Sequence, residues 1–330
     1  MKMLESKKVL VTGAGGFVGS HLAERLVDLR AKVTAFLRYS SRTHEAMIKL
    51  LPAEKKKEIR IIHGELRQPE TVKKAMKGID VVFNLAALIS IPYSYLHPQE
   101  VFETNTLGTV NVLTAAREEK AEKVIQTSTS EVYGTAQYVP IDERHPKQPQ
   151  SPYSASKIAA DAIALSFYYS FNLPVAIVRP FNTYGPRQSD RAVIPTLISQ
   201  ALVKEKILMG STTPTRDFNF VSDTVEGFIR IAESEKSIGE EINIGSGYEI
   251  SIGDLAEKII SLVGKRAKLV KDKKRARPKK SEVERLLADN SKARKLLGWS
   301  PRVNLDTGLR KTIEWIEEHP DFYKPDTYNM

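Results

Sequence analysis

The 330-residue sequence predicts an α/β fold in which a doubly wound parallel sheet is followed by a smaller, mostly helical lobe. Strand-like and helix-like segments alternate in the first half, which is typical of a parallel sheet with right-handed crossovers and helices on both faces. A glycine-rich turn joins the first strand to the first helix. Near residue 180 the alternation breaks into segments punctuated by proline and glycine, and helical patterns return after it.

The expected strands of the sheet are short and rich in β-branched residues. They are KVLVTG (8–13), KVTAFL (32–37), EIRIIHG (58–64), DVVFNLA (80–86), KVIQTSTS (123–130) and PVAIVRPFN (174–182). Amphipathic helices follow several of them. Val18, Leu22 and Leu26 recur at spacing four after the first strand, and residues 101–117 form a second helical stretch.

The second half predicts helices at 191–204, 223–234, 251–263 and 306–318, with a strand at EINIG (241–245). We therefore expect a dinucleotide-binding domain over 1–180 that regains a segment near 217–247. Residues 181–216 and 248–330 would form the second lobe, which binds the substrate.

Composition excludes several classes of protein. The chain has no cysteine, so thiolate chemistry, disulfides and Cys-type metal sites are ruled out, and its six histidines show no metal-ligand spacing. The net charge of +10 arises almost wholly from one basic stretch, 265–280, and no nucleic-acid-binding motif accompanies it. Neither a signal peptide nor a membrane-length apolar run is evident, so a cytoplasmic protein with no membrane partner is expected.

The turn after the first strand has the spacing of a phosphate-binding loop. VTGAGGFVGSHL places Gly13, Gly16 and Gly19 where the chain passes from strand to helix. Glycine is needed there because the turn is tight, the backbone must approach a pyrophosphate, and helix and strand pack without a Cβ between them. The free N–H groups of the helix terminus would face the phosphates. A Rossmann-type dinucleotide site is predicted.

The residues at the end of the second strand, which would contact the adenosine ribose, should indicate whether the cofactor is NAD or NADP. It carries Arg38 and Ser41 and no acid before Glu45, so charge-assisted hydrogen bonds to a 2′-phosphate favour NADP, with NAD as the alternative. Glu65, after the third strand, is positioned to meet adenine, although an exposed acid at a strand end is an equally good interpretation.

A tyrosine and a lysine stand four residues apart in SPYSASKIAAD, so Tyr153 and Lys157 share one face of a helix. A free tyrosine with a pKa near 10 is a poor base, but a neighbouring ammonium and a nicotinamide cation stabilise its phenolate. The pair can then take a proton from a substrate hydroxyl while hydride leaves the same carbon.

Motifs along nearly the whole chain resemble the extended short-chain dehydrogenase/reductases, the nucleotide-sugar epimerases and dehydratases. VTGAGGFVGSHL, NLAA, ETNTLGTVNVL, TSTSEVYG, YSASK, RPFNTYGPRQ and RDFNFVSD occur in family order. The resemblance implies that Thr129 hydrogen-bonds a sugar 4-hydroxyl beside the Tyr–Lys pair, and that the protein is a homodimer. The family's cofactor contacts correspond to Gly13, Phe17, Val18, Arg38, Glu65, Leu66, Ala86, Ala87 and Lys157.

The triplet Thr129-Ser130-Glu131 bears on the reaction. The family's 4,6-dehydratases use a glutamate here to remove the C5 proton after C4 oxidation, whereas simple 4-epimerases lack this carboxylate. Ser130 replaces the acid of dTDP-glucose dehydratases, which leaves the proton donor for the departing C6 hydroxyl unassigned; Glu131, once protonated, is our candidate. UDP-glucuronate decarboxylases share the triplet but resemble YDEGK where this chain has YSASK.

The strings TSTSEVYGTAQYVPIDE and RPFNTYGPRQSDRAVIPT most resemble N-acetylglucosamine-nucleotide 4,6-dehydratases of the legionaminic acid type. The resemblance implies a UDP- or GDP-N-acetylglucosamine substrate. The alternatives are a 4-epimerase, a decarboxylase or, remotely, a non-catalytic dinucleotide sensor. Ser130 would lie at the sugar, and the family's contacts to substrate diphosphate and ribose correspond to Asn182, Arg187, Arg216, Arg277 and Glu282.

Overall fold

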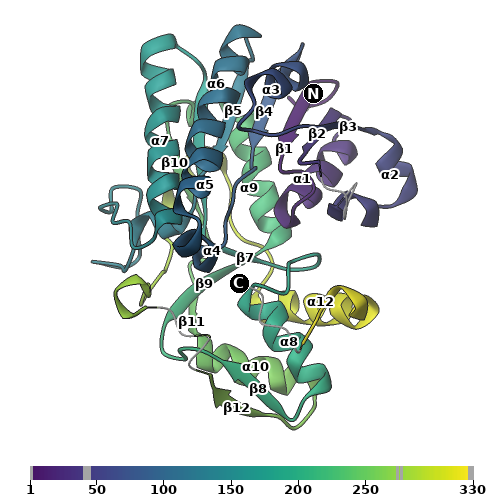
Figure 1. Ribbon diagram of the computed structural model, residues 1–330, viewed down its shortest axis with the longest axis vertical. Coiled ribbons are helices and arrows are strands. Elements are labelled where there is room, and N and C mark those ends of the chain that lie inside the picture. Colours follow the sequence, from purple (N-terminus) through teal and green to yellow (C-terminus); the bar gives the residue numbers. More distant parts are fainter. Residues whose placement is uncertain (1–2, 40–45, 273–274, 276–277, 326–330) are drawn as a thin grey trace.

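The computed structural model describes residues 3–39, 46–272, 275, 278 and 280–325 in full, with the backbone alone of 279. A seven-stranded, wholly parallel sheet forms its centre, in the order β10-β6-β5-β4-β1-β2-β3 (Figure 1). This confirms the predicted doubly wound fold. Its strands are β1 (Lys8–Thr12), β2 (Lys32–Leu37), β3 (Ile59–His63), β4 (Val81–Asn84), β5 (Lys123–Thr127), β6 (Val175–Pro180) and β10 (Glu241–Ile244).

Helices cover both faces of this sheet because successive residues of each strand point to opposite sides. Val9 and Val11 of β1 enter one core, which packs against α1 (Phe17–Asp28) and α9 (Val221–Glu233), while Leu10 enters the other core. The second core packs against α3 (Pro69–Met76), α6 (Gly108–Glu118) and α7 (Pro152–Phe171). The buried alternation explains why these strands read as nearly continuous apolar runs.

The helix expected over 101–117 is interrupted. It consists of α5 (Pro98–Phe102), a π-helical turn η2 (Glu103–Leu107) and α6, with helical backbone throughout. The wider turn places Asn105 where its side chain bonds both the amide and the carbonyl of Leu88 and the hydroxyl of Ser156 on α7. A polar position inside an otherwise regular pattern thus joins three segments.

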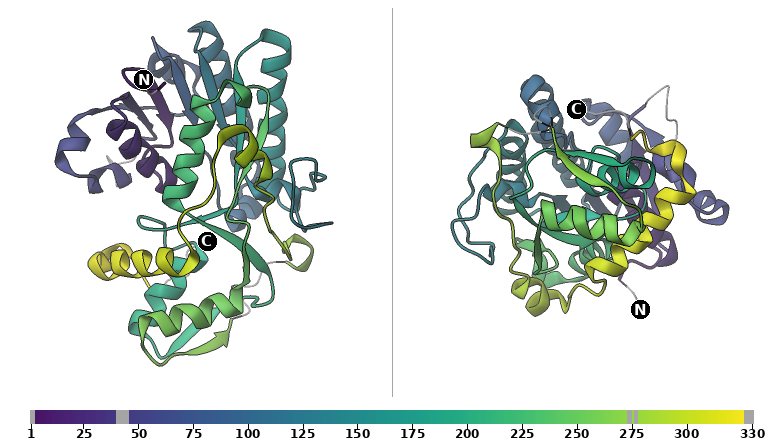
Figure 2. Two further views of the ribbon diagram at one scale, coloured as in Figure 1. Left: turned by 180° about the vertical axis from the view of Figure 1, so that it is seen from behind. Right: turned by 90° about the horizontal axis from the view of Figure 1, so that it is seen from below.

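The second lobe contains helices and two small sheets, which the sequence did not predict. β11 (Glu249–Ser251), β9 (Thr215–Phe220) and β7 (Asn182–Tyr184) form one sheet; β12 (Lys268–Lys271) and β8 (Lys206–Met209) form the other. Around them lie α8 (Val193–Val203), α10 (Ile252–Val263), α11 (Ser291–Leu297) and α12 (Leu305–Glu318). Figures 1 and 2 show α8, α10 and α12 gathered beyond one end of the main sheet.

The remaining described elements are short. They are α2 (Ala53–Lys57), α4 (Ile91–Leu96) and the 3-10 turns η1 (Ala46–Leu50), η3 (Ser130–Tyr133), η4 (Glu235–Ser237), η6 (Lys279–Ser281) and η7 (Pro320–Phe322). η3 follows β5 directly, and α4 lies in the connection after β4. Both therefore lie at the carboxyl edge of the sheet, where ligands bind in folds of this kind.

Candidate active site

The glycine loop has the close approach that the sequence predicted. Gly13 adopts φ +70°, and a Cβ on it would lie 2.8 Å from the backbone nitrogen of Ala86; a Cβ on Gly19 would lie 2.3 Å from the carbonyl oxygen of Gly13. α1 begins after Gly16 with no side-chain cap and no acid in its first turn. Its N–H groups are therefore left for an anionic ligand, and this geometry fits a pyrophosphate.

A pocket of about 430 Å³, which Arg38, Tyr39, His63 and Glu65 help to line, lies where the sequence predicts the adenosine end of the cofactor. The Arg38 guanidinium is 3.3 Å from a carboxylate oxygen of Glu65 and 3.9 Å from one of Glu100. The arginine that was expected to meet a 2′-phosphate is thus already beside two acids. Ser41 falls outside the described residues.

The other predicted cofactor contacts follow the carboxyl ends of β1, β3 and β4. Phe17 and Val18 form the first turn of α1 and are half-buried, and Ala86 and Ala87 follow β4 and are half-buried as well. Leu66 is buried, and a Cβ on Gly108 of α6 would lie 2.9 Å from its Cβ.

A buried chain of amide and hydroxyl groups crosses the sheet beneath the loop. Thr12 Oγ1 donates to Asn84 Oδ1 (2.7 Å), and Asn84 Nδ2 donates to Gln126 Oε1 (2.7 Å). The amide of Ala86 donates to Thr12 Oγ1 at 3.1 Å, so the loop after β4 is held against β1. Sequence reasoning missed this chain; its signal was one polar residue near the end of each of three adjacent apolar strands.

The structure brings the predicted catalytic residues together. Tyr153 and Lys157 lie on α7, whose N-terminus has a capping box made by Ser151 and Ser154. Thr129 caps η3, and its side chain interacts with the Tyr153 hydroxyl and lowers the pKa of that phenol. Lys157 Nζ donates to the carbonyl oxygen of Thr127 at 2.5 Å. Tyrosine, lysine and threonine therefore converge where β5 ends.

Glu131 lies in the same place. Its backbone amide donates to Thr129 Oγ1 (3.2 Å), and its carboxylate is close enough to Tyr153 for electrostatic repulsion to raise the pKa of the phenol further. Ser130 is buried next to it. An acid thus lies beside the tyrosine of the Tyr–Lys pair at the end of β5.

Burial dominates the protonation of the pair. Desolvation raises the pKa of Tyr153, and the hydrogen bond with Thr129 opposes this shift. Desolvation also lowers the pKa of Lys157 to about 8, and the negative charge of Asp161 opposes that shift. Both groups are driven toward their neutral forms, so a base at Tyr153 needs nearby positive charge.

Two predicted substrate residues share one face of a small sheet. Asn182 on β7 pairs in register with Phe218 on β9, and Arg216 stands two residues before Phe218, so all three side chains point the same way. Asn182 Nδ2 is buried and has no hydrogen-bond partner in the described part of the chain. Arg216 Nη2 bonds a carboxylate oxygen of Glu282 at 3.1 Å. An orphaned donor beside a buried guanidinium fits an anionic ligand.

The remaining two predicted substrate residues are Arg187 and Arg277. Arg277 lies outside the described residues. Arg187, with φ +67°, turns its buried guanidinium to α1, where Nη2 bonds Glu24 (2.6 Å) and His21. Burial lowers the pKa of His21 to about 4, and Arg187 acts in the same direction. These contacts join the loop after β7 to α1.

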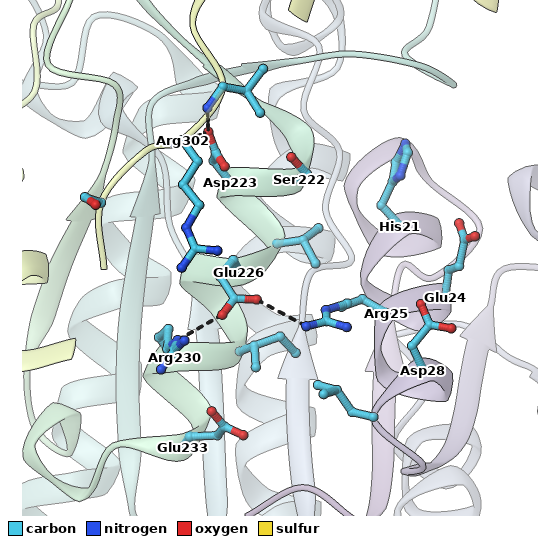
Figure 3. Close-up of a pocket in the computed structure, with 15 residues that line it drawn as sticks. His21, Glu24, Arg25, Asp28, Ser222, Asp223, Glu226, Arg230, Glu233 and Arg302 are labelled. Atoms are coloured by element: carbon cyan, nitrogen blue, oxygen red, sulfur yellow. Dashed lines mark hydrogen bonds and ion pairs between the residues drawn. The ribbon is translucent and has the colours of Figure 1, made fainter. Parts of the chain in front are cut away.

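A separate groove of about 680 Å³ lies between α1 and α9 (Figure 3). Arg25 of α1 pairs with Glu226 across it, and Arg230 pairs with Glu226 along α9. Its lining carries five carboxylates against three arginines, which is the wrong sign for a pyrophosphate. The nucleotide site is therefore not this groove.

No cluster that could hold a metal ion occurs within the described ranges, and no helix there is long and apolar enough to cross a membrane.

A doubly wound sheet with a glycine turn before its first helix, and with tyrosine and lysine meeting a threonine at the end of β5, defines an extended short-chain dehydrogenase/reductase. A family model described as GDP-mannose 4,6 dehydratase matches residues 10–312. The chain belongs to this family of nucleotide-sugar dehydratases and epimerases.

Its relatives catalyse different reactions. Human dTDP-D-glucose 4,6-dehydratase is 33% identical over 95% of this chain and 91% of its own length. UDP-N-acetyl-alpha-D-glucosaminuronate decarboxylase of Bacillus cytotoxicus is 36% identical over 94% and 98%. The structure of UDP-glucuronic acid 4-epimerase from Bacillus cereus, in complex with UDP-glucuronic acid and NAD, superposes with a TM-score of 0.86 at 31% identity, covering 94% of this chain and 99% of that one. The protein is thus an enzyme of the NAD-dependent nucleotide-sugar dehydratase/epimerase family.

Proposed function

We propose that the protein is a nucleotide-sugar 4,6-dehydratase that converts UDP- or GDP-N-acetylglucosamine to the 4-keto-6-deoxy sugar. The observation that carries this proposal is the position of Glu131, which shares Thr129 and the neighbourhood of Tyr153. An enzyme that only removes and returns one hydride at C4 has no use for a carboxylate at this point.

A bound nicotinamide dinucleotide would supply a hydride acceptor at C4, a hydride donor at C6 and the positive ring charge that favours the Tyr153 phenolate. Thr129 would orient the 4-hydroxyl, and Tyr153 would take its proton while Lys157 stabilises the phenolate. The resulting ketone acidifies the C5 proton, which Glu131 would remove. The C6 hydroxyl then leaves as water with the proton that Glu131 carries. When hydride returns to C6, C5 takes up a proton, which balances the one that Tyr153 removed from the 4-hydroxyl.

Asn182 and Arg216 are the residues we assign to the substrate diphosphate, with Ser130 at the sugar and Glu282 near the ribose. The shared face of β7 and β9 supports this assignment, as does the buried Asn182 Nδ2, which has no hydrogen-bond partner among the described residues. Arg277 remains a prediction from sequence.

For the cofactor we propose NAD, the alternative to the NADP that the sequence favoured. Two carboxylates already stand beside Arg38, and a 2′-phosphate would have to approach it against their charge. The epimerase structure described above also contains NAD.

A homodimer is also proposed. The outer surface beside α7 exposes three large apolar side chains, and the exposed fractions are 63% for Leu96 of α4, 46% for Phe102 of α5 and 51% for Leu107 of η2. A second copy that packs against these helices would cover them.

A decarboxylase is the second candidate, because the B. cytotoxicus relative is 36% identical to this chain. Mass spectrometry after incubation with UDP- and GDP-N-acetylglucosamine and with the matching uronates would separate the possibilities. Loss of water supports the dehydratase, loss of carbon dioxide the decarboxylase, and unchanged mass with altered stereochemistry an epimerase.

Replacing Glu131 by Gln tests its role directly. We expect water loss to fall by about 10²–10⁴-fold, while C4 oxidation, read as the near-ultraviolet absorbance of the reduced cofactor on mixing with substrate, persists. Tyr153→Phe is the matched control and should abolish both steps. Full dehydration by the Glu131→Gln variant would refute the role given to this carboxylate.

A further inference from the structure

A buried carboxylate that the proposed reaction does not use lies one helical turn beyond Lys157. Asp161 on α7 is fully buried. Its Oδ2 accepts a hydrogen bond from Ser128 Oγ (2.6 Å) and another from Arg179 Nη2 (3.2 Å). An acid at such depth is retained only where its partners compensate for the lost solvation, so both contacts matter.

Ser128 stands between the two backbone positions that contact the catalytic pair. The carbonyl oxygen of Thr127 accepts a hydrogen bond from the Lys157 ammonium, and the Thr129 side chain interacts with the Tyr153 hydroxyl. The Ser128–Asp161 hydrogen bond ties this segment back to α7, the helix that carries Tyr153 and Lys157. This hydrogen bond therefore holds the segment that carries Thr129 and Glu131 at a fixed distance from the helix that carries Tyr153 and Lys157.

Arg179 extends the tie to the turn that carries Glu131. Its guanidinium is fully buried, pairs with Asp161 and Glu241, and donates from Nη1 to the Tyr133 hydroxyl at 2.9 Å. Tyr133 is the last residue of η3 and donates in turn to Asn243 Oδ1 at 2.8 Å. Strand β6 thereby connects α7, η3 and β10.

We propose that Asp161 is a positioning residue: through Ser128 and Arg179 it holds the Thr129 and Glu131 segment in register with α7, and it supplies the negative charge that keeps Lys157 an ammonium. This inference rests on the proposed use of the Tyr–Lys pair. It adds a residue that touches neither substrate nor cofactor.

Among the groups around Lys157, Asp161 is the one whose charge favours the ammonium form of the lysine. The groups around Asp161 and Lys157 are the Thr127 carbonyl oxygen and Ser128 at the end of β5, Arg179 on β6 and Glu241 on β10. On η3, Tyr133 contacts Arg179, and Glu131 is the acid beside Tyr153. Asp161 is the acid that opposes the desolvation of Lys157. On the opposite side of α7, Asn105 and Ser156 are neutral, and Glu100 and Glu103 pair with Arg38 and Arg67.

Burial raises the pKa of Asp161 itself, whereas Arg179, Ser128 and Lys157 all act in the opposite direction. Removing the carboxylate charge would leave the desolvation of Lys157 unopposed. The lysine would then lose its proton at lower pH.

A double-mutant cycle tests the charge coupling without any substrate. Chemical unfolding of the wild type, Asp161→Asn, Lys157→Met and the double variant would be followed from about pH 6 to pH 9. We expect Asp161→Asn to shift the titration of Lys157 down by about one pH unit or more. At low pH, Asp161→Asn should raise the equilibrium constant of unfolding relative to the wild type, and this ratio should fall at least about tenfold as pH rises. In the Lys157→Met background, the effect of Asp161→Asn should not depend on pH.

If the effect of Asp161→Asn on the unfolding equilibrium changes with pH equally in the wild-type and Lys157→Met backgrounds, the charge coupling between Asp161 and Lys157 is overturned. Because this readout needs no turnover, it stands or falls independently of the dehydratase assignment.

Ser128→Ala tests the positioning role separately, since it removes the tie and keeps the charge, and it remains informative if Asp161→Asn does not fold. We expect kcat for C4 oxidation to fall at least tenfold, with KM and the alkaline limb of its pH profile unchanged. Ser128→Thr, which keeps the hydroxyl, should restore most of the rate. Wild-type kcat in Ser128→Ala would refute the positioning role.

Discussion

Gly19→Ala tests the glycine loop most directly. The new Cβ would lie 2.3 Å from the Gly13 carbonyl oxygen and 2.9 Å from Ala14 Cα. Both neighbours are backbone atoms, so the strand–helix turn itself must move by at least about 0.7 Å before the Cβ clears 3.0 Å. Displacements of this kind in packed structure cost about 1–3 kcal/mol.

The cost should fall on ligand binding, because the atoms that move belong to the loop that we expect to hold the cofactor pyrophosphate. At about 1.4 kcal/mol per factor of ten, affinity for NADH should drop roughly 5- to 150-fold. Fluorescence or calorimetric titration with NADH measures this drop. Gly253→Ala at the start of α10 is the matched control, because its Cβ would meet its nearest neighbours at 3.4 Å, an ordinary contact.

Gly19→Ala with wild-type NADH affinity and wild-type thermal stability would refute the reasoning. It would mean that the loop yields without cost and that the close packing of helix on strand does not shape the site.

Three further predictions concern buried charge. Lys123→Met should lower the free energy of unfolding by about 1–3 kcal/mol, measured by urea denaturation, because Nζ donates to the carbonyl oxygens of Ile231, Ala232 and Ser234 at the end of α9. The free energy of unfolding should rise between about pH 8 and pH 9.5, because burial lowers the pKa of Lys123 and of Lys157 to about 8 while the unfolded chain still binds both protons. Each lysine contributes up to ~1.4 kcal/mol per pH unit. A flat pH profile would contradict the two lowered pKa values. Arg216→Lys should weaken nucleotide-sugar binding roughly tenfold in titration, since lysine cannot make the bidentate contact; unchanged affinity would remove Arg216 from the site.

The main sheet was predictable because it is built from local signals. Buried parallel strands read as β-branched runs, and β1 to β6 and β10 all fall within the runs from which they were predicted. Helix α8 spans 193–203 where 191–204 was expected, and α12 spans 305–318 where 306–318 was expected. Caps and amphipathic spacing determine such boundaries within a few residues.

The small sheets were not predictable in the same way. β7 and β11 have three residues each, and a pairing such as that of β7 with β9 depends on contacts far apart in the chain. Periodicity needs a longer window to distinguish a strand from a loop.

For the site, sequence reasoning named the tyrosine, lysine, threonine and glutamate that the structure brings together. It did not find Asp161 or Arg179, because each is a single charged residue within an apolar segment whose partner lies on another element. Their buried positions on α7 and β6 were the available signal, since charge is seldom buried without a counter-charge. The preference for NADP relied on Arg38 alone and could not anticipate Glu100, which approaches it from α5.

The position of β10 has a consequence for biosynthesis. This strand, Glu241–Ile244, completes the sheet beside β6, although about sixty residues separate the two in the chain. At ribosomal speeds of roughly 5–20 residues per second, the nascent chain waits several seconds with the outer edge of β6 open and the Arg179 guanidinium lacking Glu241. Translation that stalls in this interval would release a product with an unpaired strand edge, which is prone to aggregate and is a natural substrate for chaperones.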